Sequence, residues 1–283
     1  MNIEQYGIYI LYTLIYIGYA VVLKYVLNFM SSQHYDADDQ LANGNLAVGL
    51  RRTGAQFGLA IAMMGVLSGG TTGSLTQDLM NSALYGLAAT MFMVSTLILT
   101  DKLVTPGIDN LKQLKENNTS VGMVELGMLV STGIISYSSI YGEAGGLLST
   151  LAYFVIGQVT LVVLIVVYEK VFTRHFDIVS QIGKGNLSAG VYLGGKLIAY
   201  ALILKSAIVG NGGSAELSDM VVEYIFLAVS GMLILYLFEF VIDLVIVTSS
   251  SMKEILNEDR IIPAVQLSSI KIGMALILSN AIL

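Results

Sequence analysis

The segment HYDADDQLANGNLAVG (34–49) recurs as HFDIVSQIGKGNLSAG (175–190), 141 positions later (175 − 34 = 141). Seven of the sixteen aligned positions are identical, and no gap is needed. Because the chain has 283 residues, the offset is half its length, and a self-match at a fixed period is the signature of a repeat architecture. The sequence therefore predicts a tandem duplication, with one half at 1–141 and the other at 142–283.

The composition indicates a membrane protein. The chain is 55% hydrophobic and 12% charged, with a mean hydropathy of +0.76, whereas soluble domains carry about 25% charged residues. A helix needs about 20 apolar residues to cross the bilayer. Runs of this kind predict an all-α polytopic protein with eight transmembrane helices, at about 7–29, 47–67, 79–100, 121–141, 147–169, 188–209, 220–247 and 262–283.

Lysine and arginine predict the orientation. They lie at the connections that follow the first, third, fifth and seventh apolar runs, whereas the other connections (69–78, 142–146 and 210–219) contain neither residue. The positive-inside rule then places the four basic connections in the cytoplasm and both termini outside. In a bacterial cell this corresponds to a multi-pass protein of the inner membrane with periplasmic termini.

The duplication also predicts the symmetry. Each half has an even number of crossings, so the halves enter the membrane in the same orientation, related by a pseudo-two-fold axis along the membrane normal. The offset aligns LKQLKENN (111–118) with MKEILNED (252–259). Each quarter also reads as helix, polar loop, helix and short outer turn, which predicts a hairpin unit used four times. Four hairpins could form a ring or two four-helix bundles.

The segments that follow two of the basic connections carry a resemblance to a known family. GNLAVGLRRTGAQFGLAIA (44–62) and GNLSAGVYLGGKLIAYALI (185–203) resemble the helix start of the YjfL-type bacterial inner-membrane proteins, catalogued as domain of unknown function number 350. The second and fourth hairpins lack the Gly-Asn pair and have Thr119-Ser120 and Ile261-Ile262 in its place. The resemblance implies two tandem copies, no established reaction, and a link to envelope stress and to membrane maintenance of the PspA type.

The repeated loop offers two interpretations. His34 with Asp36, and His175 with Asp177, could each contribute to a metal site, and Gln40 and Gln181 recur beside them. Two candidate ligands per copy are too few for a closed metal site. We therefore favour helix ends at which the aspartates act as caps. We predict no metal and no cofactor. Protonation-dependent coupling between the halves is a further hypothesis for the two histidines.

The Gly-Asn pairs and the glycines after them predict helix entry and close packing. Gly44 and Gly185 permit a sharp turn, and Asn45 and Asn186 are typical N-caps. The alternative is an anion site at the helix start, assisted in the first copy by Arg51 and Arg52 near the membrane boundary. GxxxG spacings at 54–58 and 190–194 favour close helix contact. A glycine-lined permeation path is the other possibility.

Ionisable residues inside the second half are the strongest functional candidates. Lys196, Glu239 and Lys271 each lie about eight residues into a different apolar run, or about 12 Å below the same surface, and Asp243 is one turn from Glu239. The positions aligned with the three in the first half are Ala55, Ile98 and Val130, with Gln56 near the same layer. A structural salt bridge, a proton or ion relay, and lysines that snorkel to the surface are the alternatives.

The motifs of common enzymes are absent from this sequence. It has no phosphate-binding loop, no zinc motif such as HExxH and no cysteine, and it has no basic domain for nucleic acid. We therefore expect a non-enzymatic protein, in the first instance a small-ion or small-solute channel or transporter. The alternative is a membrane scaffold that recruits a cytosolic PspA-like partner through the repeated loops. The lipid bilayer and a homo-oligomer are the other expected partners.

Overall fold

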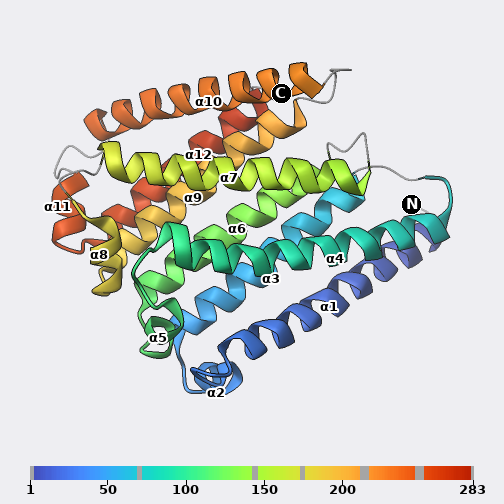
Figure 1. Cartoon of the computed structure of the whole chain (residues 1–283), viewed down its shortest axis with the longest axis horizontal. Helices are drawn as coiled ribbons and strands as arrows, with labels where there is room; N and C mark the ends of the chain where they lie inside the picture. Colours follow the sequence, from blue (N-terminus) through green and yellow to red (C-terminus); the bar gives the residue numbers. More distant parts are fainter. Residues whose placement is uncertain are drawn as a thin grey trace.

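The chain is all α-helical in the residues that the computed structural model describes, which are 3–68, 72–141, 146–172, 176–210, 217–245 and 252–281. Four short helices are α2 (Ala37–Ala42), α5 (Asn110–Lys115), α8 (Ile178–Gly183) and α11 (Met252–Asn257). A π-helix, η1 (Thr100–Val104), follows α4. The long helices of the described ranges are α1 (Ile3–Ser31), α3 (Leu46–Ser68), α4 (Leu75–Leu99), α6 (Thr119–Tyr141), α7 (Leu147–Phe172), α9 (Leu187–Val209), α10 (Leu217–Val245) and α12 (Ile261–Ala281) (Figure 1).

Seven of these eight long helices are long and apolar enough to cross a membrane. The eighth, α3, is not among them, because Arg51, Arg52 and Gln56 make it more polar than the others. By length and composition, the eight predicted crossings are therefore reduced to seven candidate spans.

The same three-helix unit occurs four times along the chain. A long helix is followed by a short helix and a second long helix, as in α1–α2–α3, and the four short helices lie at one end of the bundle (Figure 1). α9 begins 141 residues after α3 (187 − 46), but α12 begins 142 residues after α6 (261 − 119). The aligned register of 252–259 on 111–118 is therefore wrong by one residue, and Leu129, not Val130, is equivalent to Lys271.

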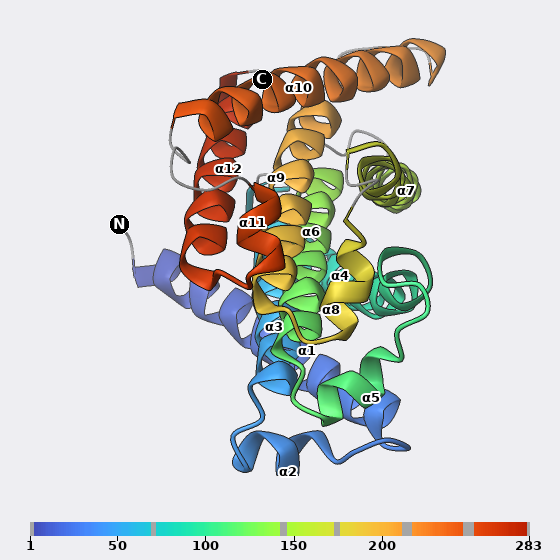
Figure 2. The same cartoon turned by 90° about the vertical axis from the view of Figure 1, so that its left-hand side faces the viewer.

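The long helices form two layers. The inner layer is a row in which α3 packs on α6, α6 on α9, and α9 on α12, and it runs without a break across the midpoint of the chain. In the outer layer, α4, α7 and α10 each cover the groove between two neighbouring inner helices (Figure 2). Among the described residues, α3 and α12 share no extensive contact, so the row is open. The expectations of a ring and of two separate bundles are both wrong. The predicted pseudo-two-fold axis is wrong too, because a two-fold would map the contact of α6 with α9 onto a contact of α12 with α3.

Glycines set the spacing of the inner row. A Cβ atom added at Gly54 would lie 2.7 Å from the Leu126 Cα, and one added at Gly127 would overlap the backbone of Gly194. Gly133 meets the backbone of Gly58 in the same way. The predicted role of the glycines in close helix packing is confirmed. Because the backbones touch at these points, a glycine-lined path between the inner helices is excluded there.

Candidate ion-pair site

Three ionisable side chains from three long helices meet in the second half of the chain. Lys196 lies on α9, Glu239 on α10 and Lys271 on α12. The Lys196 Nζ is 3.1 Å from Oε2 of Glu239, and the Lys271 Nζ is 3.6 Å from the same oxygen. The structure thus brings together the three residues that the sequence places at one depth.

The group is buried, and among the side chains that the structure describes its charges do not balance. The two lysine side chains are 0% exposed and the Glu239 side chain is 8% exposed, so snorkelling of either lysine to the surface is excluded. Oε1 of Glu239 has no hydrogen-bond partner among the described residues. When all three groups are ionised, two positive charges share one negative charge in an interior where unpaired charge is costly. Loss of a proton or binding of a counter-ion would restore the balance.

Tyrosine rings surround the Lys196 ammonium group. Its Nζ lies 3.3 Å from the centroid of the Tyr168 ring and 5.5 Å from that of Tyr200. The centroids of the Tyr192 and Tyr236 rings are also 5.5 Å away. Aromatic faces stabilise a desolvated cation, in favourable cases by about 2 kcal/mol. The rings therefore offset part of the cost of burying this charge.

The tyrosine hydroxyls extend the polar contacts of the lysines. The Tyr192 hydroxyl accepts a hydrogen bond from the Lys271 Nζ at 3.0 Å and lies 2.7 Å from the Tyr168 hydroxyl. The hydroxyls of Tyr200 and Tyr236 pair at 2.6 Å. Sequence reasoning missed all four tyrosines. The spacing of Tyr192, Lys196 and Tyr200, four residues apart on one helix face, is the signal that could have found two of them.

Two further residues were expected in the same polar layer. Gln56 lies on α3 in the other half of the row, is half-buried, and is not part of the group; its backbone carbonyl accepts a hydrogen bond from the Tyr16 hydroxyl at 3.4 Å. The side chain of Asp243 lies outside the described residues. The observed group is therefore Lys196, Glu239 and Lys271, and we call it the second-half cluster.

The aspartates of the repeated loop are helix caps. Oδ1 of Asp36 accepts the backbone N–H groups of Asp38 and Asp39 at 2.9 and 3.1 Å, at the start of α2. Asp177 accepts from the Ser180 N–H at 2.9 Å, at the start of α8. His34 is exposed, and His175 lies outside the described residues. Within the described ranges, no three His, Cys, Asp or Glu residues are grouped as a metal site would require.

The Gly-Asn pairs form a turn before an inner helix. Gly44 and Gly185 have φ angles of 80° and 85°, in the left-handed region that favours glycine. Asn45 Oδ1 accepts the Val48 N–H at 3.0 Å, and Asn186 Oδ1 accepts the Ala189 N–H at 2.9 Å, so the predicted capping role is confirmed. Of the two repeated glutamines, Gln40 accepts from the Asn45 amide with its side chain at 2.7 Å, and Gln181 accepts from the Asn186 N–H with its backbone carbonyl at 3.0 Å.

The asparagine side chains also connect successive hairpins. The Asn45 Nδ2 donates to the Leu114 carbonyl of α5 at 2.9 Å, and the Asn186 Nδ2 donates to the Leu256 carbonyl of α11 at 2.6 Å. Asn118 makes the equivalent bond to the Ile182 carbonyl of α8 at 3.0 Å. An amide donates along the row at every step, which explains why asparagine is used here.

The second and fourth hairpins have the same turn in another form. Asn117 and Asp259 take the left-handed conformation, with φ angles of 60° and 50°. Asn118 then caps α6 by accepting the Ser120 N–H at 3.0 Å. The turn therefore lies at 117–118 and 259–260, two residues before Thr119-Ser120 and Ile261-Ile262, the positions that the sequence alignment set against the Gly-Asn pair. Asparagine and aspartate tolerate this conformation better than most residues, so glycine is not required.

Both halves of the chain match one family model. Residues 1–140 and 143–282 each match the family described as Domain of Unknown Function (DUF350). The chain belongs to this family. A "UPF0719 transmembrane protein" of Aquifex aeolicus (strain VF5) is 26% identical over 200 residues, which cover 67% of this chain and 72% of that protein. No solved structure matches the chain.

The first DUF350 copy contains a buried ion pair of its own. The Arg51 Nη1 lies 3.3 Å from Oε1 of Glu125, and the two side chains are 6% and 1% exposed. The sequence interpretation placed Arg51 at the membrane boundary, where it would assist an anion site at the start of the helix. The structure instead turns this side chain into the groove between α3 and α6, so that interpretation is wrong.

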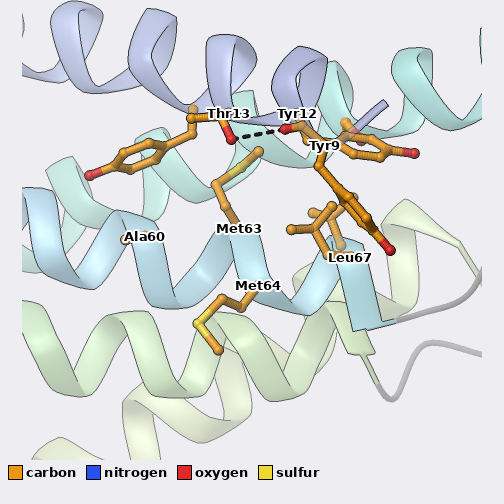
Figure 3. Close-up of a pocket in the computed structure, with 10 residues that line it drawn as sticks. Tyr9, Tyr12, Thr13, Ala60, Met63, Met64 and Leu67 are labelled. Carbon is orange, nitrogen blue, oxygen red and sulfur yellow. Dashed lines mark hydrogen bonds between the residues drawn. The ribbon is translucent and has the colours of Figure 1, made fainter. Parts of the chain in front are cut away.

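A cavity of about 240 Å³ lies in the same copy, between α1, α3 and α4. Tyr9, Tyr12, Met63 and Leu67 are among the side chains that line it, and Figure 3 shows how they approach one another. The Thr13 hydroxyl donates to the Tyr9 carbonyl at 2.8 Å, so it is already satisfied. No residue of the second-half cluster lines this mostly apolar space, and it does not extend the candidate site.

Proposed function

We propose that this DUF350 protein is a non-enzymatic transporter that moves a small ion or solute across a bacterial inner membrane, with proton exchange at the second-half cluster. One observation carries the proposal: two buried ammonium groups share one carboxylate oxygen, while the other oxygen of that carboxylate has no partner among the described residues. Ionisable groups are kept in membrane helices at a considerable cost in free energy, and they commonly mark ion or substrate pathways.

The geometry favours a path between the two helix layers. Backbone contacts at the glycines close the inner row, whereas Lys196 projects from the inner helix α9 to meet Glu239 on the outer helix α10. Movement of α10 relative to α9 and α12 would separate the charges and open the group to one side. The tight packing favours a carrier with such a movement over an open channel.

We further propose eight crossings, with both termini outside and the two halves in the same orientation. The four short helices lie at one end of the bundle, and Lys102, Lys112, Lys115, Lys184 and Lys253 lie at the same end, as expected for a cytoplasmic face (Figure 1). In this arrangement α3 crosses the membrane at one edge of the inner row, with Arg51 paired with Glu125.

Single-cysteine labelling tests this topology, because the chain contains no cysteine of its own. In intact cells, a membrane-impermeant maleimide is expected to label Ser74→Cys, at the end opposite the short helices, and to leave Glu116→Cys unlabelled until the membrane is permeabilised. Both positions are exposed. Labelling of Glu116→Cys from outside would contradict the proposed orientation.

Proton flux tests the transport proposal. In liposomes with a trapped pH dye, the purified protein is expected to dissipate an imposed proton gradient, and Glu239→Gln to reduce the rate by about tenfold or more, because an amide cannot exchange the proton. Glu258→Gln, a matched change at an exposed carboxylate, should leave the rate unchanged. A wild-type protein that moves neither protons, potassium nor putrescine would contradict the proposal.

A membrane scaffold is the alternative, and the repeated face at the short-helix end favours it. The four short helices present one motif at regular intervals, which suits a symmetric cytosolic partner of the PspA type, and the open ends of the row would allow a second copy to extend it. The alternative predicts no flux, together with capture of a cytosolic oligomer that is lost when the exposed residues of α5 and α8 are changed.

A further inference from the structure

The two halves bury charged groups in equivalent grooves. Arg51 is equivalent to Tyr192 (192 − 51 = 141), and Glu125 to Leu267 (267 − 125 = 142), in the offsets that relate the inner helices. The Arg51–Glu125 pair thus lies between α3 and α6, where the second-half cluster lies between α9 and α12. The Arg51–Glu125 pair is about one helical turn closer to the short-helix end than the second-half cluster. This is because Ala55 is the equivalent of Lys196, and Arg51 precedes Ala55 by four residues (55 − 51).

A second carboxylate lies near this pair. Asp101, in the π-helix η1 that follows α4, is close enough to interact electrostatically with both Arg51 and Glu125. When all are ionised, two carboxylates lie near one guanidinium group, although only Glu125 forms an ion pair with it, and the excess charge is negative rather than positive as in the second half. Oε2 of Glu125 has no hydrogen-bond partner among the described residues, and its side chain is 1% exposed.

We infer that the first half contains a proton-binding site in which Glu125 takes up one proton beside Arg51 and Asp101. Uptake converts the Glu125 carboxylate into a carboxylic acid and removes the excess negative charge of the group. A proton needs no cavity, which suits a carboxylate enclosed by packed helices. Glu125 is the acceptor rather than Asp101, because Oε2 of Glu125 is buried without a partner among the described residues, whereas Asp101 is half-buried and accepts from the Asn110 Nδ2 at 2.6 Å.

The other groups around Glu125 leave this balance unchanged. Tyr35, between α1 and α2, is within electrostatic reach, and burial raises the pKa of its hydroxyl, so it stays neutral. Asp109, at the start of α5, acts on Asp101 and adds to the negative potential. Arg52 is beside Arg51 but forms its ion pair with Asp38, at 3.4 Å, on the exposed side of α3. The excess charge therefore remains with Glu125 and Asp101.

Infrared difference spectroscopy on the full chain in lipid vesicles tests this inference without any flux measurement. As the pH falls, the wild type is expected to show the carbonyl band of a buried, weakly hydrogen-bonded carboxylic acid. Glu125→Gln should remove this band, whereas Glu116→Gln, at an exposed carboxylate of the same half, should retain it. Glu239→Gln should also retain it, so failure of the transport proposal is a separate outcome.

A second variant covers the case in which Glu125→Gln does not fold. Asp101→Asn removes the competing carboxylate and leaves Glu125 paired with Arg51, so the midpoint of the band should move to lower pH. A purely structural salt bridge would show no such band in the wild type. A band that survives Glu125→Gln, or a midpoint that Asp101→Asn does not move, overturns the inference.

Discussion

A Glu239→Leu variant is expected to lose about 3–5 kcal/mol in its free energy of unfolding, because it removes the carboxylate that pairs with two buried ammonium groups. Both lysine side chains are 0% exposed, so neither can reach water without a rearrangement of α9 or α12. Unfolding of the purified protein by titration with a denaturing detergent, at neutral pH, measures the loss. An unfolding midpoint equal to that of the wild type would contradict the prediction.

The triple variant Lys196→Leu, Glu239→Leu and Lys271→Leu is the control for this prediction. Replacement of all the charges by apolar side chains of similar volume is often neutral or stabilising. The tyrosine hydroxyls keep partners in it, because Tyr168 pairs with Tyr192 at 2.7 Å and Tyr200 with Tyr236 at 2.6 Å. The triple variant should therefore unfold near the wild type. If it is as unstable as Glu239→Leu, packing rather than charge determines the loss.

A Gly133→Leu variant is expected to lose about 3 kcal/mol or more, or to fail to assemble, because even a Cβ atom at this position would overlap the backbone of Gly58. The contact joins α3 and α6, two helices of the inner row, so relief would require the row to open. Thermal unfolding monitored by circular dichroism, together with the yield of monodisperse protein, measures the effect.

Gly273→Leu is the matched control for the glycine prediction. Gly273 lies on α12 at the free edge of the row, and nothing would lie within 4 Å of an added Cβ atom. The same substitution there should leave the unfolding transition within about 1 kcal/mol of the wild type, since an added Cβ atom meets no neighbour within 4 Å. Equal losses at both positions would contradict the packing of α3 on α6.

The helices, the duplication and the hairpin unit could be predicted from the sequence, because apolar length and a fixed period are local or additive signals. The arrangement of the hairpins could not. A period of 141 residues is compatible with a ring, two bundles or an open row, and the choice depends on contacts such as Gly127 on Gly194, which join residues far apart in the chain. The one-residue shift between 111–118 and 252–259 arises because the two halves differ in length before α11.

The candidate site was predictable in part. The matched depths of Lys196, Glu239 and Lys271 follow from the helix rise alone. The ring of Tyr168 could not be placed beside Lys196, because it comes from another helix and nothing in the sequence gives the rotation of α7. Arg51 was assigned to the boundary because two adjacent arginines usually mark one, whereas its burial depends on Glu125, 74 residues away.

We propose that the second-half cluster exchanges protons rather than only holding helices together. Proton flux through liposomes containing the triple leucine variant tests it most directly, because that variant keeps the packing and removes the charges. The transport account predicts that the variant folds as the wild type does and carries no flux above that of protein-free liposomes. A folded triple variant with wild-type flux would contradict it.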